Sequence, residues 1–173
     1  MPQIIPVSPW VADYCGHIQP GRRVLDLACG SGRHTRLLVS LGYPVLAVDR
    51  DGGALACLRE LAAVEIRVLD LEEDNWPLSG ELFAGIVVTN YLWRPHLANL
   101  LACLAPGGVL IYETFMLGNE VYGKPSNPAF LLRSGELREI AQAAGLDELA
   151  WIEGYTDQPK PAMRQAIVAK RPI

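Results

Sequence analysis

The chain has 173 residues, with 19 acidic and 15 basic side chains and a formal net charge of −4 at pH 7. This length predicts one domain over residues 1–173, and a hydrophobic content of 50% excludes an intrinsically disordered chain. The acidic balance argues against a large nucleic-acid-binding surface, and no apolar stretch reaches the ~20 residues that span a bilayer, so we expect a cytoplasmic protein without a membrane partner.

The first half of the chain alternates short apolar runs with helical stripes. It begins with a segment, residues 1–20, that we expect to form a helical cap. Buried strands are predicted at 22–28, 44–48, 65–69 and 84–89. Helices are predicted at 33–41 and 53–63, whereas residues 70–83 show no helical stripe and predict a loop.

The second half continues the alternation. Leucines at helical spacing predict a helix over Leu97–Leu104, which the turn-forming Pro106–Gly108 would end. A further helix is predicted near 137–144, with Ser134 as its N-cap and Gly145 just past its end. Strands are predicted at 109–114, 147–154 and 165–170. The last two strands have no helix between them and therefore predict an antiparallel hairpin.

This order of elements predicts an α/β fold. Strands that alternate with helices form a doubly wound, mostly parallel sheet, with helices on both faces, which is a three-layer sandwich. The terminal hairpin would add one antiparallel strand.

The cysteines suggest no metal or redox chemistry. They are far apart in sequence and form no CxxC pair; they are Cys15, Cys29, Cys57 and Cys103. That spacing fits neither a zinc site nor a thioredoxin-type motif. We expect free thiols in a reducing compartment and no metal site.

The turn after the first strand has the composition of a ligand-binding loop. Gly30 and Gly32, one residue apart, let the backbone turn tightly and approach a ligand. Asp49 ends the second strand, 19 residues after Gly30, where an acid can accept hydrogen bonds from ribose hydroxyls. Asp26 ends the first strand, and its carboxylate would repel a pyrophosphate. The third glycine of a dinucleotide motif is also missing, because Thr35 stands there. Together these residues favour a cationic cofactor such as S-adenosylmethionine (SAM) over NAD.

Four segments carry a resemblance to a known family. VLDLACGSG, AVDRD, VLDLE and LAPGGVLIYETF resemble the successive motifs of class I, seven-stranded SAM-dependent methyltransferases. The resemblance runs from about residue 20 to residue 170, and within the family the chain is similar to small bacterial methyltransferases of the tellurite-resistance type. It implies strand order 3-2-1-4-5-7-6 with strand 7 antiparallel, SAM as cofactor and S-adenosylhomocysteine as product.

The resemblance also implies roles for individual residues. Asp26, Gly30 and Gly32 match the first motif, and Ala28 stands where many members have another glycine. Asp49 matches the ribose-binding acid, and the pair at 70–71 matches the adenine contact. The cofactor-binding set implied in this way is Asp26, Ala28, Cys29, Gly30, Gly32, Asp49, Arg50, Asp70, Leu71, Asn90 and Tyr91.

Residues 113–133 form the second informative segment. They are rich in proline and glycine, show no periodicity and follow a strand at its carboxyl end, so we expect a loop on the substrate side. We expect the acceptor to be bound by Arg94, Asn119, Tyr122 and Lys124. Of these, the positively charged Arg94 and Lys124 would suit an anionic acceptor.

Methyl transfer needs a base only when the nucleophile loses a proton, so no catalytic triad is required. If a base acts, the candidates are Tyr91, His96 and Glu113, and His34 is a candidate for the cofactor cleft. The sequence TNYL after the fourth strand departs from the N/D-P-P-Y/F motif of base and glutamine methylation. We therefore expect a small-molecule acceptor. The alternatives are a tRNA, rRNA or protein methyltransferase that relies on a partner, and a SAM-binding module without turnover.

Overall fold

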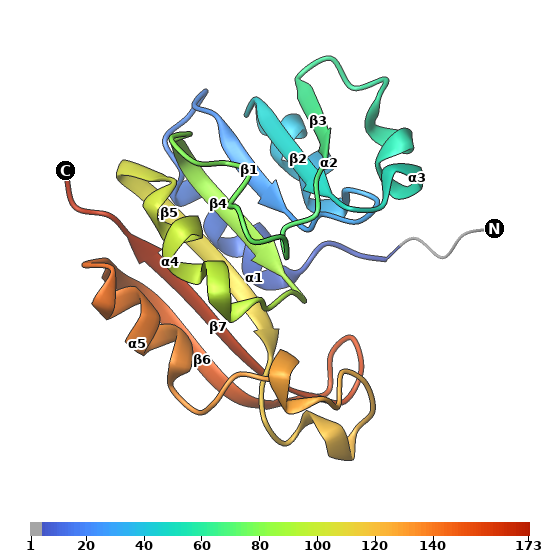
Figure 1. Cartoon of the computed structure of the whole chain (residues 1–173), viewed down its shortest axis with the longest axis vertical. Coiled ribbons are helices and arrows are strands. Elements are labelled where there is room, and N and C mark those ends of the chain that lie inside the picture. Colours follow the sequence, from blue (N-terminus) through green and yellow to red (C-terminus); the bar gives the residue numbers. More distant parts are fainter. Residues whose placement is uncertain (1–4) are drawn as a thin grey trace.

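The computed structural model describes residues 5–173 and contains one seven-stranded sheet in the order β3-β2-β1-β4-β5-β7-β6 (Figure 1). The strands are β1 (Val24–Leu27), β2 (Val45–Asp49), β3 (Val64–Val68), β4 (Phe83–Thr89), β5 (Leu104–Phe115), β6 (Asp147–Thr156) and β7 (Ala162–Lys170). The five strands from β3 to β5 are parallel, and β7 is antiparallel to both β5 and β6. The predicted order and the reversed strand are confirmed.

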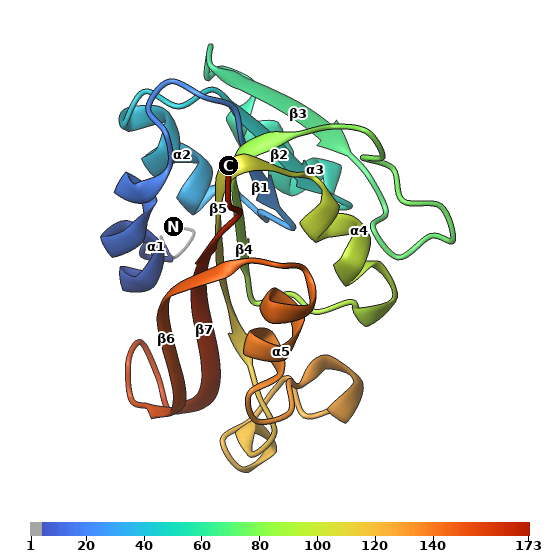
Figure 2. The same cartoon turned by 90° about the vertical axis from the view of Figure 1, so that its left-hand side faces the viewer.

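Helices lie on both faces of the sheet, which confirms the three-layer sandwich. The α-helices are α1 (Pro9–Tyr14), α2 (Arg33–Ser40), α3 (Gly52–Leu55), α4 (Leu97–Ala102) and α5 (Glu136–Ala143). Single 3-10 turns are η1 (Cys15–His17), η2 (Ala56–Leu58), η3 (Arg94–His96), η4 (Asn119–Val121) and η5 (Pro128–Phe130). Figure 2 shows α1 and α2 on one side of the sheet and α4 and α5 on the other. No helix within residues 5–173 is long and apolar enough to cross a membrane.

The central strands are apolar on both faces because both are covered. In β1, Leu25 and Leu27 join the core under α4 and α5, whereas Val24 joins the core under α1 and α2. Asp26 is the exception: a carboxyl group with 2% exposure in the middle of a buried strand.

The predicted end of the second helix and the predicted cap of the last helix are wrong. The helix predicted at 53–63 is only α3 followed by η2, and the chain then turns towards β3 through a hydrogen bond from Leu61 N to Leu58 O. Ser134 does not cap α5. The N-cap is Gly135, with φ +71°, and the Ser134 hydroxyl donates instead to Glu153 Oε1 at 2.7 Å. Gly145 does lie just past α5, with φ +71° and its N–H bonded to Gln142 O.

The turn predicted at Pro106–Gly108 is present, but it lies inside a strand. β5 pairs with β4 at Leu104, then again from Val109 onward, and the residues between them form an irregularity. Gly107 has φ +74°, which favours glycine. Helix α4 therefore ends earlier than the leucine stripe predicts, at Ala102.

Beyond the carboxyl end of β5 lies an irregular stretch, residues 116–135, which we call the connector (Figure 1). It contains η4 and η5 and is tied to the end of β5 by a bridge between Met116 and Leu132. Of the predicted 113–133 loop, residues 113–115 belong to β5. The connector thus lies at the edge of the sheet where the parallel strands end, which in such folds is the ligand-binding edge.

Candidate functional site

The loop between β1 and α2 is built from left-handed backbone. Ala28, Gly30 and Gly32 have φ of +51°, +57° and +80°. A Cβ at Gly32 would lie 2.6 Å from both terminal carbons of Leu58, so this glycine is required for conformation and for packing. A Cβ at Gly30 would meet nothing within 4 Å. Ala28 is therefore the one of these three residues that has a side chain, and this side chain disfavours its left-handed backbone conformation.

We expect Ala28→Gly to stabilise the protein. Left-handed backbone costs a non-glycine residue about 1–2 kcal/mol, and the extra freedom of glycine in the unfolded chain offsets about 0.4–1 kcal/mol of that. The expected net gain is about 0.5–1 kcal/mol in the free energy of unfolding, measured by urea denaturation. The control is Ala141→Gly inside α5, which should lose at least about 1 kcal/mol. If Ala28→Gly were destabilised as much as this control, the backbone strain at Ala28 would be contradicted.

Asp49 holds this loop against the end of β2. Its Oδ2 accepts the N–H of Gly30 at 2.8 Å, and its Oδ1 accepts the N–H of Asp51 at 2.9 Å. Each carboxylate oxygen has a further lone pair, so Asp49 can still accept hydrogen bonds from a ligand.

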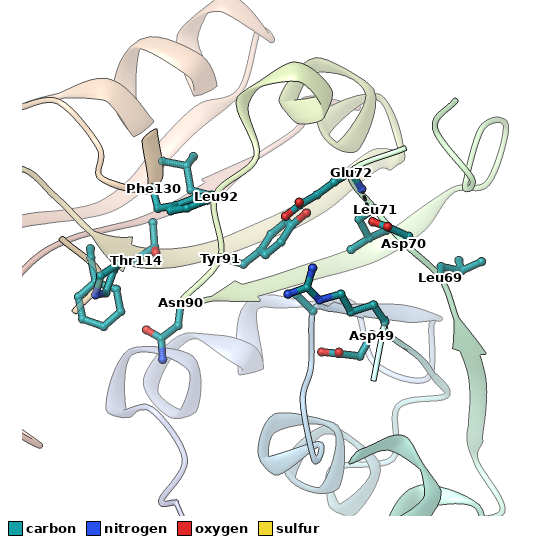
Figure 3. Close-up of a pocket in the computed structure, with 14 residues that line it drawn as sticks. Asp49, Leu69, Asp70, Leu71, Glu72, Asn90, Tyr91, Leu92, Thr114 and Phe130 are labelled. Atoms are coloured by element: carbon teal, nitrogen blue, oxygen red, sulfur yellow. Dashed lines mark hydrogen bonds between the residues drawn. The ribbon is translucent and has the colours of Figure 1, made fainter. Parts of the chain in front are cut away.

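A cavity of about 430 Å³ opens beside Asp49 (Figure 3). Its size falls in the range of small-molecule sites. Its walls come from the ends of the strands and from the connector; they are Ala28, Asp49, Arg50, Leu69, Asp70, Leu71, Glu72, Asn90, Tyr91, Leu92, Thr114, Phe115, Pro125 and Phe130. Seven of the eleven predicted cofactor residues are among them: Ala28, Asp49, Arg50, Asp70, Leu71, Asn90 and Tyr91.

One end of the cavity is acidic. Asp70 accepts the N–H of Glu72 at 2.9 Å, and the ring of Tyr91 points towards these two residues (Figure 3). The Tyr91 hydroxyl is buried and has no hydrogen-bond partner within residues 5–173. Burial, with the nearby charges of Glu72 and Asp70, raises the pKa of Tyr91. The phenol therefore stays protonated at neutral pH and is a poor candidate for a base.

The other four predicted cofactor residues do not line the cavity. Asp26 lies behind the loop, where it accepts the Thr35 hydroxyl at 2.6 Å. Burial raises the pKa of Asp26 to about 7, although the hydrogen bonds from Thr35 favour the charged form. Cys29 is half-buried in the same place, and burial raises the pKa of its thiol. Gly30 and Gly32 supply backbone conformation.

The two candidate histidines have structural partners. His34 Nε2 accepts Ser8 N–H at 3.0 Å, and burial lowers its pKa to about 3, so the ring is neutral. His96 is buried in η3, off the cavity wall; its Nε2 donates to Glu73 O at 2.6 Å and its Nδ1 accepts from Asn99 at 3.0 Å. With both ring nitrogens occupied, His96 is not placed to act as a base.

Arg94, which we expected to bind an acceptor, is engaged within the protein. Its Nε and Nη2 form two hydrogen bonds with the buried carboxylate of Glu136, at 2.7 and 2.9 Å. The same guanidinium donates to the carbonyls of Ala129 and Leu131, at 2.9 and 2.7 Å. Arg94 therefore fixes the connector, and its donors are used within the protein.

The predicted connector residues also lie off the cavity. Asn119 is 2% exposed and bridges Pro125 O and Met163 N, so its role is structural. Tyr122 is exposed and packs against the ring of Tyr155, with centroids 5.4 Å apart. Lys124 is exposed, and it does not line the cavity.

Sequence reasoning missed seven wall residues: Leu69, Glu72, Leu92, Thr114, Phe115, Pro125 and Phe130. Four of them belong to the segment expected on the substrate side, so that segment was the available signal, although it is Thr114, Phe115, Pro125 and Phe130 that line the cavity and not the polar residues predicted there. Within residues 5–173, no three His, Cys, Asp or Glu side chains gather as metal ligands would.

Comparison with known proteins identifies relatives of this chain. Residues 24–108 match a family model described as a methyltransferase domain. A trans-aconitate 2-methyltransferase of Methylobacterium nodulans is 41% identical over 148 residues, covering 75% of this chain and 55% of that protein. A tRNA U34 carboxymethyltransferase of Methylococcus capsulatus is 32% identical over 120 residues, covering 61% of this chain and 36% of that protein. The chain thus spans between 36% and 55% of the length of these two relatives.

Solved structures share the fold. TehB from Haemophilus influenzae superposes with a TM-score of 0.77 and 22% identity, covering 95% of this chain and 62% of that one. A 1,6-didemethyltoxoflavin-N1-methyltransferase from Burkholderia thailandensis, with 1,6-didemethyltoxoflavin and S-adenosylhomocysteine bound, gives 0.71 and 22%, covering 95% and 77%. At this identity the likeness concerns the architecture.

Proposed function

This chain belongs to the class I SAM-dependent methyltransferases, whose cofactor is SAM, and we propose that it transfers a methyl group from SAM to a small-molecule acceptor. The observation that carries the proposal is the cavity at the carboxyl ends of the strands, which joins the motif residues on one side to the connector on the other. The relatives' names include both tRNA and small-molecule acceptors, so the acceptor class is part of the proposal.

The residues present suit SAM. Asp49 has free acceptor capacity for ribose hydroxyls, and Leu69 and Leu71 offer apolar wall for a planar base. The unpartnered Tyr91 hydroxyl is a buried polar group that a ligand atom could satisfy. The cavity wall carries the carboxylates of Asp49, Asp70 and Glu72 against the single guanidinium of Arg50, and this net negative charge matches a cationic ligand.

SAM supplies an electrophilic methyl group on a sulfonium, and its leaving thioether is neutral. The chain's own task is then to bind, orient and exclude water. Asp49 and Asp70 hold polar groups at one end, while Phe115, Pro125 and Phe130 cover the other with apolar surface. Tyr91 is protonated, His96 is occupied, and Glu113 is not on the cavity wall and faces Arg164. These contacts support catalysis by positioning, without a general base.

Two further observations bear on the acceptor and the location. The connector brings Pro125 and Phe130 onto the cavity wall, which limits the space left for a second ligand and favours a small acceptor. All four cysteines are free thiols, which supports the cytoplasm as the site of action.

A methyl-transfer screen tests this function. Purified protein with SAM is offered thiols, selenium and tellurium oxyanions, amines and small carboxylates, with tRNA and a protein fraction in separate arms. The product S-adenosylhomocysteine is hydrolysed enzymatically and measured as homocysteine. We expect turnover with at least one of these classes. Turnover only with tRNA or a protein fraction would contradict the small-molecule assignment, and tight SAM binding without turnover in any arm would make the chain a binding module.

A further inference from the structure

An arginine that the mechanism above does not use lies beside the cavity. Arg164, near the start of β7, donates from Nη2 to Oδ1 of Asn90 at 2.7 Å. Its guanidinium also lies over the ring of Phe115, 4.5 Å from the centroid. Asn90 and Phe115 are both cavity-wall residues. Arg164 is therefore one side chain removed from the cavity, at the end opposite Asp70 and Glu72.

The charge around Arg164 is unbalanced. Its Nη2 lies 3.8 Å from a carboxylate oxygen of Glu113, and the two side chains are 17% and 13% exposed. Arg33 brings a second guanidinium to this cluster, and its Nη1 donates to the carbonyl of Pro6. It lies close enough to Arg164 to affect the pKa of Arg164. Arg33 also faces Asp26, whose pKa is raised to about 7, so within residues 5–173 Glu113 is the one fully charged carboxylate beside the two arginines. Burial and the repulsion from Arg33 lower the pKa of Arg164, although Glu113 opposes this.

Arg94 shows how an arginine can use its donors within the protein, since it bonds to Glu136 and to two backbone carbonyls. The guanidinium of Arg164 makes one hydrogen bond within residues 5–173, to Asn90, and its contact with Glu113 is longer than a hydrogen bond. Donors therefore remain for a further partner, and a half-buried excess positive charge favours an anion.

Asn90 links Arg164 to the cavity wall. It directly follows β4 in left-handed backbone, with φ +56°, and its N–H bonds to the carbonyl of Glu113. Arg164 holds the Asn90 side chain from the far side. The cavity is thus acidic at the Asp70 end, and it adjoins a positively charged cluster at the Asn90 end.

We propose that Arg164, held by Asn90 and Glu113 and assisted by Arg33, is the recognition residue for an anionic acceptor that carries a carboxylate or comparable oxyanion. This rests on the proposed function, and it gives that function a substrate class. The planar guanidinium suits two-point hydrogen bonding to such a group. Arg164 takes the role that the sequence assigned to Arg94 and Lys124.

Binding to the protein saturated with S-adenosylhomocysteine tests the proposal without turnover. The probes are succinate and selenite, with succinamide as the uncharged counterpart of succinate, and binding is measured by calorimetry. Arg164→Met removes the guanidinium that lies over Phe115 but keeps an unbranched side chain, and Arg164→Lys keeps the charge. The matched control is Arg36→Met on α2, whose guanidinium contacts the carbonyl of Cys57.

We expect at least one anion to bind wild type and Arg36→Met alike, succinamide to bind neither, and Arg164→Met to weaken the anion about tenfold or more, with Arg164→Lys intermediate. Affinity for S-adenosylhomocysteine should be equal in all four proteins. Unchanged anion binding in Arg164→Met, no anion binding in wild type, or weakened S-adenosylhomocysteine binding in Arg164→Met would each overturn the proposal. Arg164-dependent anion binding without methyl transfer to any acceptor would contradict the proposed function and leave the anion site standing.

Discussion

At pH 8, Asp26→Asn should unfold with a free energy about 4 kcal/mol higher than wild type in the absence of ligand. Burial raises the pKa of Asp26 from 3.8 to about 7, and each pKa unit corresponds to about 1.4 kcal/mol. The asparagine keeps an oxygen that accepts the Thr35 hydroxyl, but it carries no buried charge. Urea denaturation at a series of pH values measures the difference.

The sign of the pH dependence follows from the direction of that shift. Below pH 3.8 the carboxyl group is protonated in the folded and unfolded chains, so Asp26→Asn and wild type should be similar. Between there and about pH 7 the unfolded chain loses its proton first, and wild type loses stability relative to the variant. Above about pH 7 the difference is constant.

His34 would obscure this trend in wild type alone. Its pKa is lowered from 6.5 to about 3, so the folded protein gains stability as pH rises through that interval, opposite to Asp26. Subtracting wild type from variant removes the His34 contribution, because both proteins carry it. Asp74→Asn, a change at an exposed site, is the control and should show no such pH-dependent gain. A constant difference between Asp26→Asn and wild type from pH 4 to pH 8 would refute the buried charge.

Asp49→Asn should weaken S-adenosylhomocysteine binding about tenfold to a hundredfold. Both oxygens of Asp49 accept backbone N–H groups, from Gly30 and Asp51. An amide nitrogen in place of either oxygen cannot accept, so the loop loses an anchor and the ligand loses an acceptor. Losing one or two such contacts costs about 1–3 kcal/mol. Calorimetric titration gives the affinity.

Asp51→Asn is the matched control for that change. It also removes one charge beside the loop, but a single Asp51 oxygen, Oδ1, accepts both Gly53 and Ala54 N–H groups, and asparagine retains this cap. Its affinity for S-adenosylhomocysteine should match wild type. Equal losses in both variants would mean that net charge, rather than the geometry of Asp49, governs binding.

The fold could be predicted from sequence because its signals are local. Apolar runs identified the strands, and the missing helix before the last strand identified the reversed β7. The predictions were wrong where contacts with distant parts of the chain override the local sequence preference. Residues 59–63 have helical spacing, but the chain must turn back into β3, and Ser134 is a good cap that instead bonds to Glu153 on β6.

The candidate site also has a part that could be predicted from the sequence and a part that could not. The loop residues Ala28, Asp49 and Asn90 could be placed because motif, strand end and glycine spacing specify backbone geometry. The residues on the acceptor side could not be predicted, because the sequence does not show which polar side chains form hydrogen bonds within the protein. Arg94 is fully engaged, whereas Arg164 reaches the cavity wall because β7 inserts next to β5.

The central claim is that this cavity holds SAM, and direct titration tests it most simply. Calorimetry of the purified chain with SAM and with S-adenosylhomocysteine should show saturable, one-to-one binding of both, weakened by Asp49→Asn and unaffected by Asp51→Asn. Absence of binding up to millimolar concentrations of either ligand, by a folded protein, would contradict the account.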